Sequence, residues 1–280
     1  MTYMASRSLN LVFPQWQGSG KRKYLYYGAK TIAGELSDGA RYIEVDVSME
    51  DDIRLEKGIW GYHQINEQLA NARDIIEKEH PEKIFLIGGD CGTEVAPVSY
   101  LNKLYGGDLA ILWLDAHGDL NTPVTSTSHN FHGMPLRCLL GESEPTLVVQ
   151  CFSALRPLQV IMGGLRDLDP AEAEFIEKTG IVCLKVRDME TDEGRMSEII
   201  RGKRFHNLYI HIDVDVLDSG KCPWALCPAP DGISTGALMR MLLDLKAKFN
   251  IAGISVLELK PVEGMDLGPI KRLVKFCEGI

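Results

Sequence analysis

Short apolar runs alternate with amphipathic stretches along the whole chain. We interpret eight of these runs as strands, at Leu9–Phe13, Tyr42–Val47, Lys83–Ile87, Leu109–Leu114, Gln159–Met162, Ile181–Leu184, Leu208–Ile212 and Ile251–Leu257. Stretches between them show the helical period, as at Ile59–Lys78, Ala171–Lys178 and Thr235–Phe249. Strands that alternate with helices indicate parallel crossovers. The pattern therefore predicts an α/β fold with three layers, α-β-α, around an eight-stranded, mainly parallel sheet.

The composition supports a single globular core. The 280 residues are 45% hydrophobic and 25% charged, which is enough to bury one large core. The sequence has no internal repeat and no low-complexity segment. We therefore expect one domain over residues 1–280.

The charge of the chain argues against a polyanionic partner. Its formal net charge is -9, whereas nucleic-acid binders ordinarily carry a clustered basic surface. The basic run Lys21-Arg22-Lys23 is the main feature in favour of such a partner, and short runs of this kind are usually solvated loops. No stretch approaches 18 consecutive apolar residues, and the N-terminus lacks the pattern of a leader peptide. We expect a soluble, cytoplasmic protein that binds neither nucleic acid nor membranes.

The seven cysteines do not form the pattern of a secreted disulfide framework or of a zinc ribbon. Their number is odd, and close pairs with C-x-x-C spacing are absent from the sequence. Cys222 and Cys227 are separated by four residues, so we interpret them as unpaired thiols in a loop.

Polar and acidic residues follow nearly every predicted strand. In an open parallel sheet, ligands bind just beyond the carboxyl ends of the strands. The segments at those positions are Gly88–Cys91, Asp115–Asp119, Gly164–Asp169, Asp213–Asp215 and Glu258. The chemistry of the protein is therefore expected at this edge of the sheet.

Two of these segments predict a metal site. In DAHGD the polar residues are Asp115, His117 and Asp119, and side chains two apart on an extended strand point to the same face. HIDVDVLD adds Asp213 and Asp215. Carboxylates packed so closely raise one another's pKa, and two divalent cations would compensate their charge. Oxygen-rich coordination with one imidazole suits hard ions such as Mn²⁺.

A plainer interpretation exists for each of these residues taken alone. An aspartate after a strand is often a helix N-cap, and a lone D-x-D is often a cap or a loop. His117 alone could be a hydrogen-bonded core histidine. The metal site is favoured because the plainer interpretation would have to explain five acidic residues at once.

The motifs resemble those of the arginase (ureohydrolase) family. DAHGD at 115–119 matches one family signature, HIDVDVLD at 211–218 resembles another, and GGDCG at 88–92 resembles the third, which usually has histidine where this chain has Cys91. The similarity runs in register from about residue 83 to 260. It implies two divalent metal ions, with Mn²⁺ expected. The first would be held by Cys91, Asp115, Asp119 and Asp213, and the second by His117, Asp115, Asp213 and Asp215.

The resemblance also implies catalytic and substrate-binding residues. A hydroxide that bridges the ions would attack the guanidinium carbon, steered by Asp119, while Glu258 pairs with the guanidinium and His132 passes a proton to the leaving amine. His129 would lie at the pocket mouth. The polar residues expected to hold the amino-acid end of the substrate are Asn121, Ser128, Asn130, Asp169 and Glu172.

These residues imply hydrolysis of a small-molecule guanidino amino acid. The expected substrate is L-arginine or N-ω-hydroxy-L-arginine, which would yield ornithine and urea or hydroxyurea. Family members are commonly homo-oligomers, as trimers or hexamers. A second role for Asp169, followed by Pro170, is to start the helix at 171, and the two roles are compatible.

Two departures from the family pattern bear on function. A Cys91 thiolate makes the metal cluster more negative than histidine would, which favours softer ions such as Zn²⁺ or Co²⁺ and is shared with the amidinohydrolases that act on N-ω-hydroxy-arginine. Bulkier residues at 222–228 replace a Thr/Gly-rich loop under the guanidinium. The alternative hypothesis is a metal-deficient, non-catalytic member of the family that binds a metabolite or partner.

Overall fold

The computed structural model describes residues 7–20, 22–35, 41–191 and 194–280. All eight predicted strands are present and form one all-parallel sheet in the order β2-β1-β5-β10-β9-β6-β7-β8. Their bounds are β1 Ser8–Phe13, β2 Tyr42–Glu44, β5 Lys83–Gly88, β6 Leu109–Leu114, β7 Val160–Gly163, β8 Val182–Leu184, β9 Asn207–Ile212 and β10 Asn250–Val256. The predicted fold class is confirmed.

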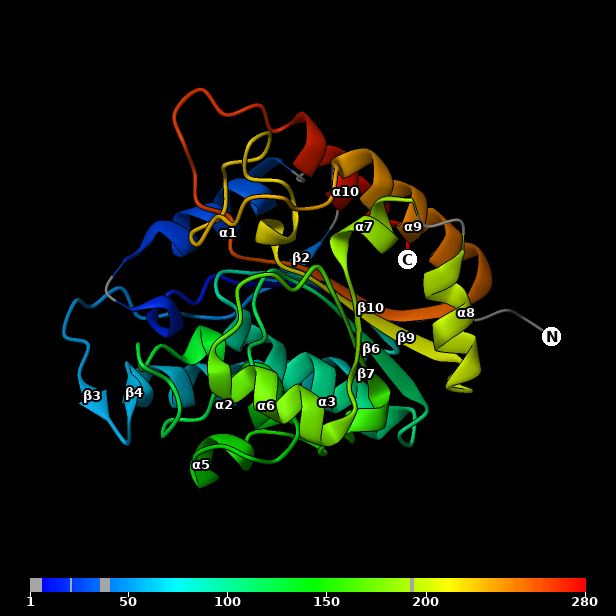
Figure 1. Ribbon diagram of the computed structural model, residues 1–280. Coiled ribbons are helices and arrows are strands. Elements are labelled where there is room, and N and C mark those ends of the chain that lie inside the picture. Colours follow the sequence, from blue (N-terminus) through cyan, green and yellow to red (C-terminus); the bar gives the residue numbers. More distant parts are fainter. Residues whose placement is uncertain (1–6, 21, 36–40, 192–193) are drawn as a thin grey trace.

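Helices cover both faces of this sheet (Figure 1). One layer contains α2 (Tyr62–Glu79), α3 (Val95–Leu104) and α6 (Pro170–Thr179), and the other contains α1 (Tyr24–Glu35), α9 (Thr235–Lys248) and α10 (Gly268–Glu278). The shorter helices are α4 Pro135–Leu139, α5 Pro145–Val148, α7 Val186–Glu190 and α8 Arg195–Gly202, and the single 3₁₀ turns are η1 Gln17–Ser19, η2 Cys91–Glu94, η3 Phe131–Gly133, η4 Pro157–Gln159 and η5 Val214–Val216.

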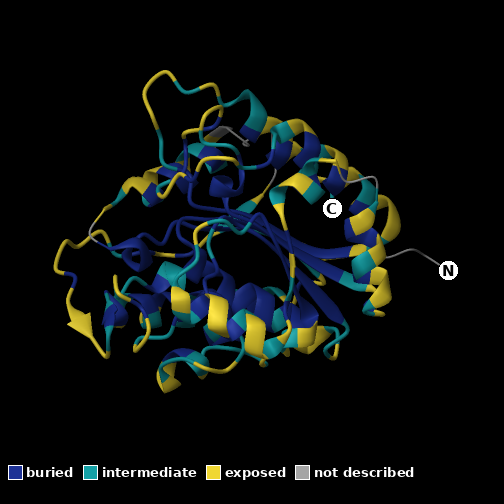
Figure 2. Cartoon of the chain, in the orientation of Figure 1, coloured by how far each residue is buried: buried dark blue, intermediate teal, exposed yellow. Residues whose placement is uncertain are grey.

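The six inner strands supply side chains to two hydrophobic cores, one on either side of the sheet. Along β6, Leu109, Ile111 and Trp113 join the core under α2 and α3, whereas the alternate residues join the core under α9 and α10. This alternation explains why β6 is apolar at every position, since both of its faces are covered. The middle of the sheet is correspondingly buried, whereas the edge strands β2 and β8 include exposed residues (Figure 2).

The predicted helix Ile59–Lys78 begins later than its apolar period suggested. Ile59 and Trp60 form the short strand β4, which pairs antiparallel with β3 (Leu55–Glu56). Gly61 adopts a φ of 68°, and α2 begins at Tyr62. A left-handed glycine interrupts the helical hydrogen bonds, so the apolar residues before it belong to the hairpin.

The basic run near the N-terminus is described in part. Lys21 lies outside the described residues, and Lys23 forms an ion pair with Asp51 at 2.6 Å. Within the described part of the chain, no helix is both long enough and apolar enough to cross a bilayer.

Gly89 is required where the end of β5 meets the end of β1. A Cβ at this position would lie 1.9 Å from the backbone oxygen of Gln15, which itself accepts a hydrogen bond from the Asp90 N–H. We expect Gly89→Ala to lower the free energy of unfolding by about 3 kcal/mol, as overpacking against backbone does. Urea denaturation measures this change. Gly34→Ala, where no described residue lies within 4 Å of the added methyl, is the control and should be neutral or stabilising; equal effects of the two substitutions would contradict the prediction.

Candidate metal centre and active site

The predicted metal ligands and Glu258 lie at the carboxyl ends of the four central strands, β5, β10, β9 and β6, and Asp169 and Glu172 follow the neighbouring strand β7. A cavity of about 210 Å³ opens there, lined by Cys91, His117, Asp119, Asn121, Ser126, Ser128, His132, Gly133, Asp167, Asp169, Glu172, Asp213, Asp215, Cys227 and Glu258. Of the predicted metal ligands, catalytic residues and substrate-binding residues, two are not among its lining. Asp115 is fully buried next to His117, and Asn130 lines an adjoining depression that shares His132 and Cys227 with the cavity.

The DAHGD segment reaches the site as a loop, which corrects the expectation of an extended strand. β6 ends at Leu114, and Asp115 accepts a hydrogen bond from the His117 N–H at 2.7 Å. Asp119 adopts a φ of 53°, in the left-handed region that is unfavourable for a non-glycine residue. The three polar side chains therefore converge through a tight turn and not through strand alternation.

Polar contacts connect the aspartates after β9 to this loop. Asp213 accepts a hydrogen bond from the Asp215 N–H at 2.7 Å, and Asp215 accepts one from the Ala116 N–H at 2.9 Å. The second oxygen of Asp215 lies 2.8 Å from His117 Nδ1. These contacts tie the ends of β9 and β6 together beneath the cavity.

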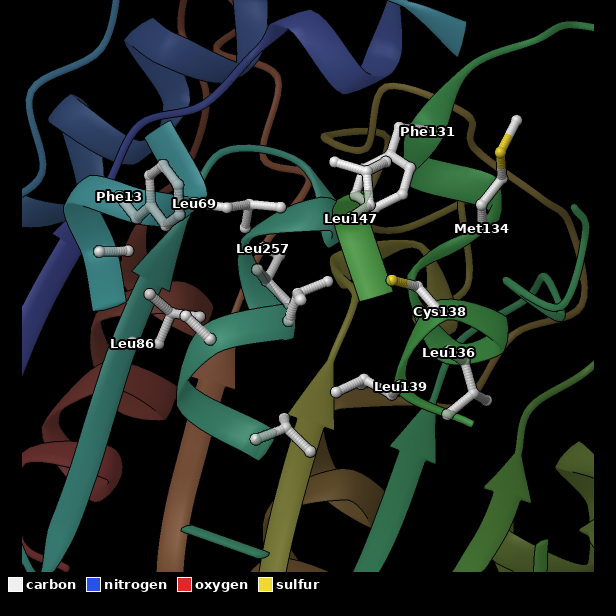
Figure 3. Close-up of a cluster of buried hydrophobic side chains, with 14 of the residues drawn as sticks. Phe13, Leu69, Leu86, Phe131, Met134, Leu136, Cys138, Leu139, Leu147 and Leu257 are labelled. Carbon is white, nitrogen blue, oxygen red and sulfur yellow. The ribbon is translucent and has the colours of Figure 1, made fainter. Parts of the chain in front are cut away.

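Glu258 connects the end of β10 to the Cys91 turn and to His132. Its Oε1 accepts a hydrogen bond from the Cys91 N–H at 3.2 Å and lies 3.1 Å from His132 Nδ1. Like Asp119, Glu258 adopts a left-handed conformation, with a φ of 62°. Phe131, beside His132, is fully buried in the hydrophobic cluster with Met134 (Figure 3).

Among the residues that the structure describes, three groups of donor atoms are spaced closely enough to hold metal ions. In each group the atoms lie within 4.8 Å of one another, and the groups are Cys91, Asp115, Asp119 and His211; Cys91, Asp213 and Glu258; and Asp115, His117 and Asp215. Asp119 Oδ2 is buried and has no hydrogen-bond partner among the described residues. A buried carboxylate oxygen without a partner is costly, and a cation would satisfy it. The residues present therefore fit metal ions.

The carboxylates cannot all ionise without added positive charge. Burial and the charges of Asp215 and Asp115 raise the pKa of Asp213 well above its ordinary value. Burial and Asp115 raise the pKa of Asp215 to about 7, and the same two causes raise the pKa of Asp119. Like charges in a buried site have this effect, and divalent cations reverse it.

The same electrostatics apply to the thiol of Cys91. Its Sγ lies 3.4 Å from an oxygen of Asp213, and burial together with the charge of Asp119 raises the pKa of the thiol well above its usual value. A thiolate at this position therefore requires a nearby cation.

Sequence reasoning missed His211, which belongs to the first donor group. His211 precedes Asp213 by two residues, so the strand period that pointed to Asp213 and Asp215 also included the histidine. Its partner Glu94, in η2, is also fully buried. No local pattern marks Glu94, because its contact with His211 spans 117 positions of the sequence.

Residues expected to bind the amino-acid end of a substrate lie on one wall of the cavity. Asn121 donates a hydrogen bond from Nδ2 to Asp169 at 2.8 Å. Asp169 and Glu172 form a capping box at the start of α6, so the predicted capping role of Asp169 is confirmed. Glu172 also accepts a hydrogen bond from the Leu120 N–H at 2.9 Å. Ser128 lines the same cavity, whereas His129 contacts the backbone oxygen of Gly58 and does not.

The segment at 222–228 contributes less bulk to the cavity than its sequence suggested. Trp224 and Cys222 are buried in the core beneath α9 and α10, and only Cys227 of this segment lines the cavity. All seven cysteines are free thiols, as expected for Cys222 and Cys227.

Comparison with known sequences gives a consistent result. A model of the arginase family matches residues 24–266. The arginase of Staphylococcus aureus strain COL is 30% identical over 241 residues, which cover 79% of each chain. Arginase-1 of Mus musculus is 27% identical over 243 residues, covering 82% of this chain and 74% of its own.

Solved structures share the fold. Entamoeba histolytica arginase in complex with L-ornithine superposes with a TM-score of 0.86 at 21% identity, over 99% of this chain and 100% of that one. Bacillus cereus arginase superposes with a TM-score of 0.81 at 24% identity, over 98% and 99% of the two chains. With a family model that matches most of its length and a relative at 30% identity over 79% of it, this chain belongs to the arginase family.

Proposed function

We propose that this protein hydrolyses a guanidino amino acid, L-arginine or N-ω-hydroxy-L-arginine, to ornithine and urea or hydroxyurea. The observation that carries the proposal is one cavity that joins three metal-donor groups, the His132–Glu258 pair and the Asn121–Asp169 pair. Support also comes from the Entamoeba arginase, whose structure contains L-ornithine.

Two divalent ions fit the donor groups, and Mn²⁺ is the ion we expect from the family. Cys91, Asp115, Asp119 and Asp213 would hold one, and His117, Asp115, Asp213 and Asp215 the other. Such ions, when bound, lower the pKa of water and so supply a nucleophile at neutral pH.

The remaining residues would orient the substrate and move protons. Both contacts of Glu258 with Cys91 and His132 fall on Oε1, so we expect Oε2 to face the guanidinium. Asp119 would accept a hydrogen bond from the attacking water. His132, held by Glu258, would pass a proton to the amine that leaves as the guanidine carbon–nitrogen bond breaks.

The test is metal analysis of the purified protein followed by assays for urea and hydroxyurea. After addition of Mn²⁺, we expect two metal ions per chain and turnover of L-arginine or of N-ω-hydroxy-L-arginine. Two bound ions without turnover of any guanidine would overturn the proposal and favour a non-catalytic member of the family.

Asp169 should determine affinity for the α-ammonium group of the substrate. We expect Asp169→Asn to raise KM for L-arginine by about 10-fold, equal to about 1.4 kcal/mol, with kcat little changed. Asparagine is also a good N-cap, so α6 should be retained. The internal control is 5-guanidinopentanoate, which lacks the α-ammonium group. An equal rise in KM for both compounds would contradict the assignment.

A further inference from the structure

A fully buried polar network lies directly behind the Cys91 donor group. His211 Nδ1 lies 2.8 Å from Glu94 Oε1, and Glu94 also accepts hydrogen bonds from the hydroxyls of Tyr209 and Ser255. All four residues are 0% exposed. A buried carboxylate with this many donors is held in one position, and it holds the imidazole in turn.

Aromatic stacking also holds the ring of His211 in place. It stacks on Trp113, its neighbour across β9 and β6, with the ring centroids 3.6 Å apart and the planes within 10° of parallel. Rotation about either side-chain bond would break the stacking or the contact with Glu94. The direction of the second ring nitrogen, Nε2, is therefore set by the fold.

Nε2 points into the group of metal donors. It lies 3.5 Å from Asp115 Oδ2 and 4.0 Å from Cys91 Sγ, and Asp119 completes the group within 4.8 Å. Ligand atoms of a tetrahedral ion bound at 2.0–2.3 Å are roughly 3.3–3.8 Å apart, close to these separations. With Nδ1 donating its proton to the carboxylate of Glu94, the neutral imidazole would present the lone pair of Nε2 to this space.

We propose that His211 is a direct ligand of the metal ion at the Cys91 site and that Glu94 positions it. The imidazole that the family motif carries at position 91 would thus be supplied from the adjacent part of the fold, by β9. A carboxylate behind a ligating histidine is a common arrangement around metals, because it fixes the ring and increases its basicity. The inference rests on the proposed function only in requiring that the site holds a metal ion.

The ligand set has a consequence for metal choice. Cys91 and His211 give the first ion one sulfur and one nitrogen donor alongside Asp115 and Asp119, whereas the His117 site is otherwise made of carboxylates. Mixed sulfur and nitrogen donors favour Zn²⁺ or Co²⁺ over Mn²⁺. The two sites should therefore differ in affinity for Co²⁺, the Cys91 site being the tighter.

The experiment uses Co²⁺ as the probe and the full chain as the sample. The variant His211→Asn removes Nε2, while its amide can still donate to Glu94. We expect the dissociation constant of the tighter Co²⁺ site to rise at least about 100-fold, and the nitrogen signature of one imidazole to disappear from the X-ray absorption spectrum of that site. The sulfur-to-cobalt charge-transfer band from Cys91 should weaken with it.

Two further variants keep the test decisive if His211→Asn folds poorly. Glu94→Gln leaves His211 in place but removes the charge behind it, and should weaken Co²⁺ binding about 10–100-fold. Tyr209→Phe removes another hydrogen bond from the same network and is the matched control, with Co²⁺ affinity expected to stay within about 3-fold. If His211→Asn and Glu94→Gln bind Co²⁺ as the unaltered protein does, with the same spectrum, the network is only structural and the inference is wrong.

This experiment measures Co²⁺ binding and not hydrolysis, so either proposal can be wrong while the other stands. A protein that binds Co²⁺ through His211 but turns over no guanidine overturns the proposed function and leaves this inference standing. A protein that hydrolyses arginine while His211→Asn retains its Co²⁺ affinity overturns this inference alone.

Discussion

Asp115→Asn is expected to empty both metal sites and to lower the hydrolysis of arginine by about 1,000-fold or more, as removal of a central catalytic group does. Asp115 belongs to two of the three donor groups, and it is fully buried where they meet. Asparagine has nearly the same shape and can still accept the hydrogen bond from the His117 N–H, whereas the contact with the Trp113 indole N–H, which falls on the other oxygen of Asp115, is lost. The loss should therefore reflect charge and coordination, with the backbone of the loop intact.

Metal content by mass spectrometry and urea release measure this prediction. Asp218→Asn, at the end of the HIDVDVLD motif and outside the donor groups and the cavity, is the matched control and should retain two ions and full activity. In the presence of a chelator, Asp115→Asn should be less stable than the unaltered protein: against the effect of burial, the imidazoles of His117 and His211 lower the pKa of Asp115, so its charge contributes to stability. Retention of two ions by the variant would show that Asp115 does not bridge the sites.

His132→Asn should lower kcat by about 10²–10⁴-fold, the usual contribution of a general acid, while two metal ions remain bound. His132 belongs to no donor group, and its Nδ1 contacts Glu258 at the cavity wall. Because the substrate would still bind, KM should change much less than kcat. Steady-state kinetics combined with metal analysis separate this result from loss of an ion.

The matched control is the same substitution three residues earlier. His129→Asn alters a histidine of the same loop that contacts the Gly58 backbone and does not line the cavity. His129 has a φ of 59°, a conformation that asparagine tolerates. The kcat of the His129→Asn variant should equal that of the unaltered protein. A similar loss of kcat in both variants would mean that the loop conformation, and not the proton of His132, is what matters.

The sheet could be predicted from the sequence because its strands are covered on both faces. β6 is then apolar at every position and β9 at all but Asn207 and His211, which separates them from the amphipathic helices around them. The sequence pattern predicts a helix at Ile59 and Trp60 because their apolar spacing continues that of α2. The period alone does not distinguish a hairpin from a helix when the break is a single glycine, Gly61.

The candidate site was predictable in composition but not in geometry. Strand ends in a parallel sheet share one edge, which is why Asp115, Asp213 and Glu258 could be expected together. The turn that brings Asp119 into the cluster depends on a left-handed backbone conformation. No residue pattern in the sequence predicts that conformation. The role of His211 could not be predicted from the sequence, because it depends on Glu94. This buried acid lies on another element, and only the folded chain brings it near.

Phe131 has a consequence for how the site would work during turnover. Its ring is fully buried among the residues of Figure 3, so the neighbouring His132 is attached to the protein interior and not to a free-standing loop. The entropy of ordering this histidine is then lost during folding and is not lost again with each substrate. Turnover should accordingly depend little on solvent viscosity, because no lid carrying the proton donor has to close.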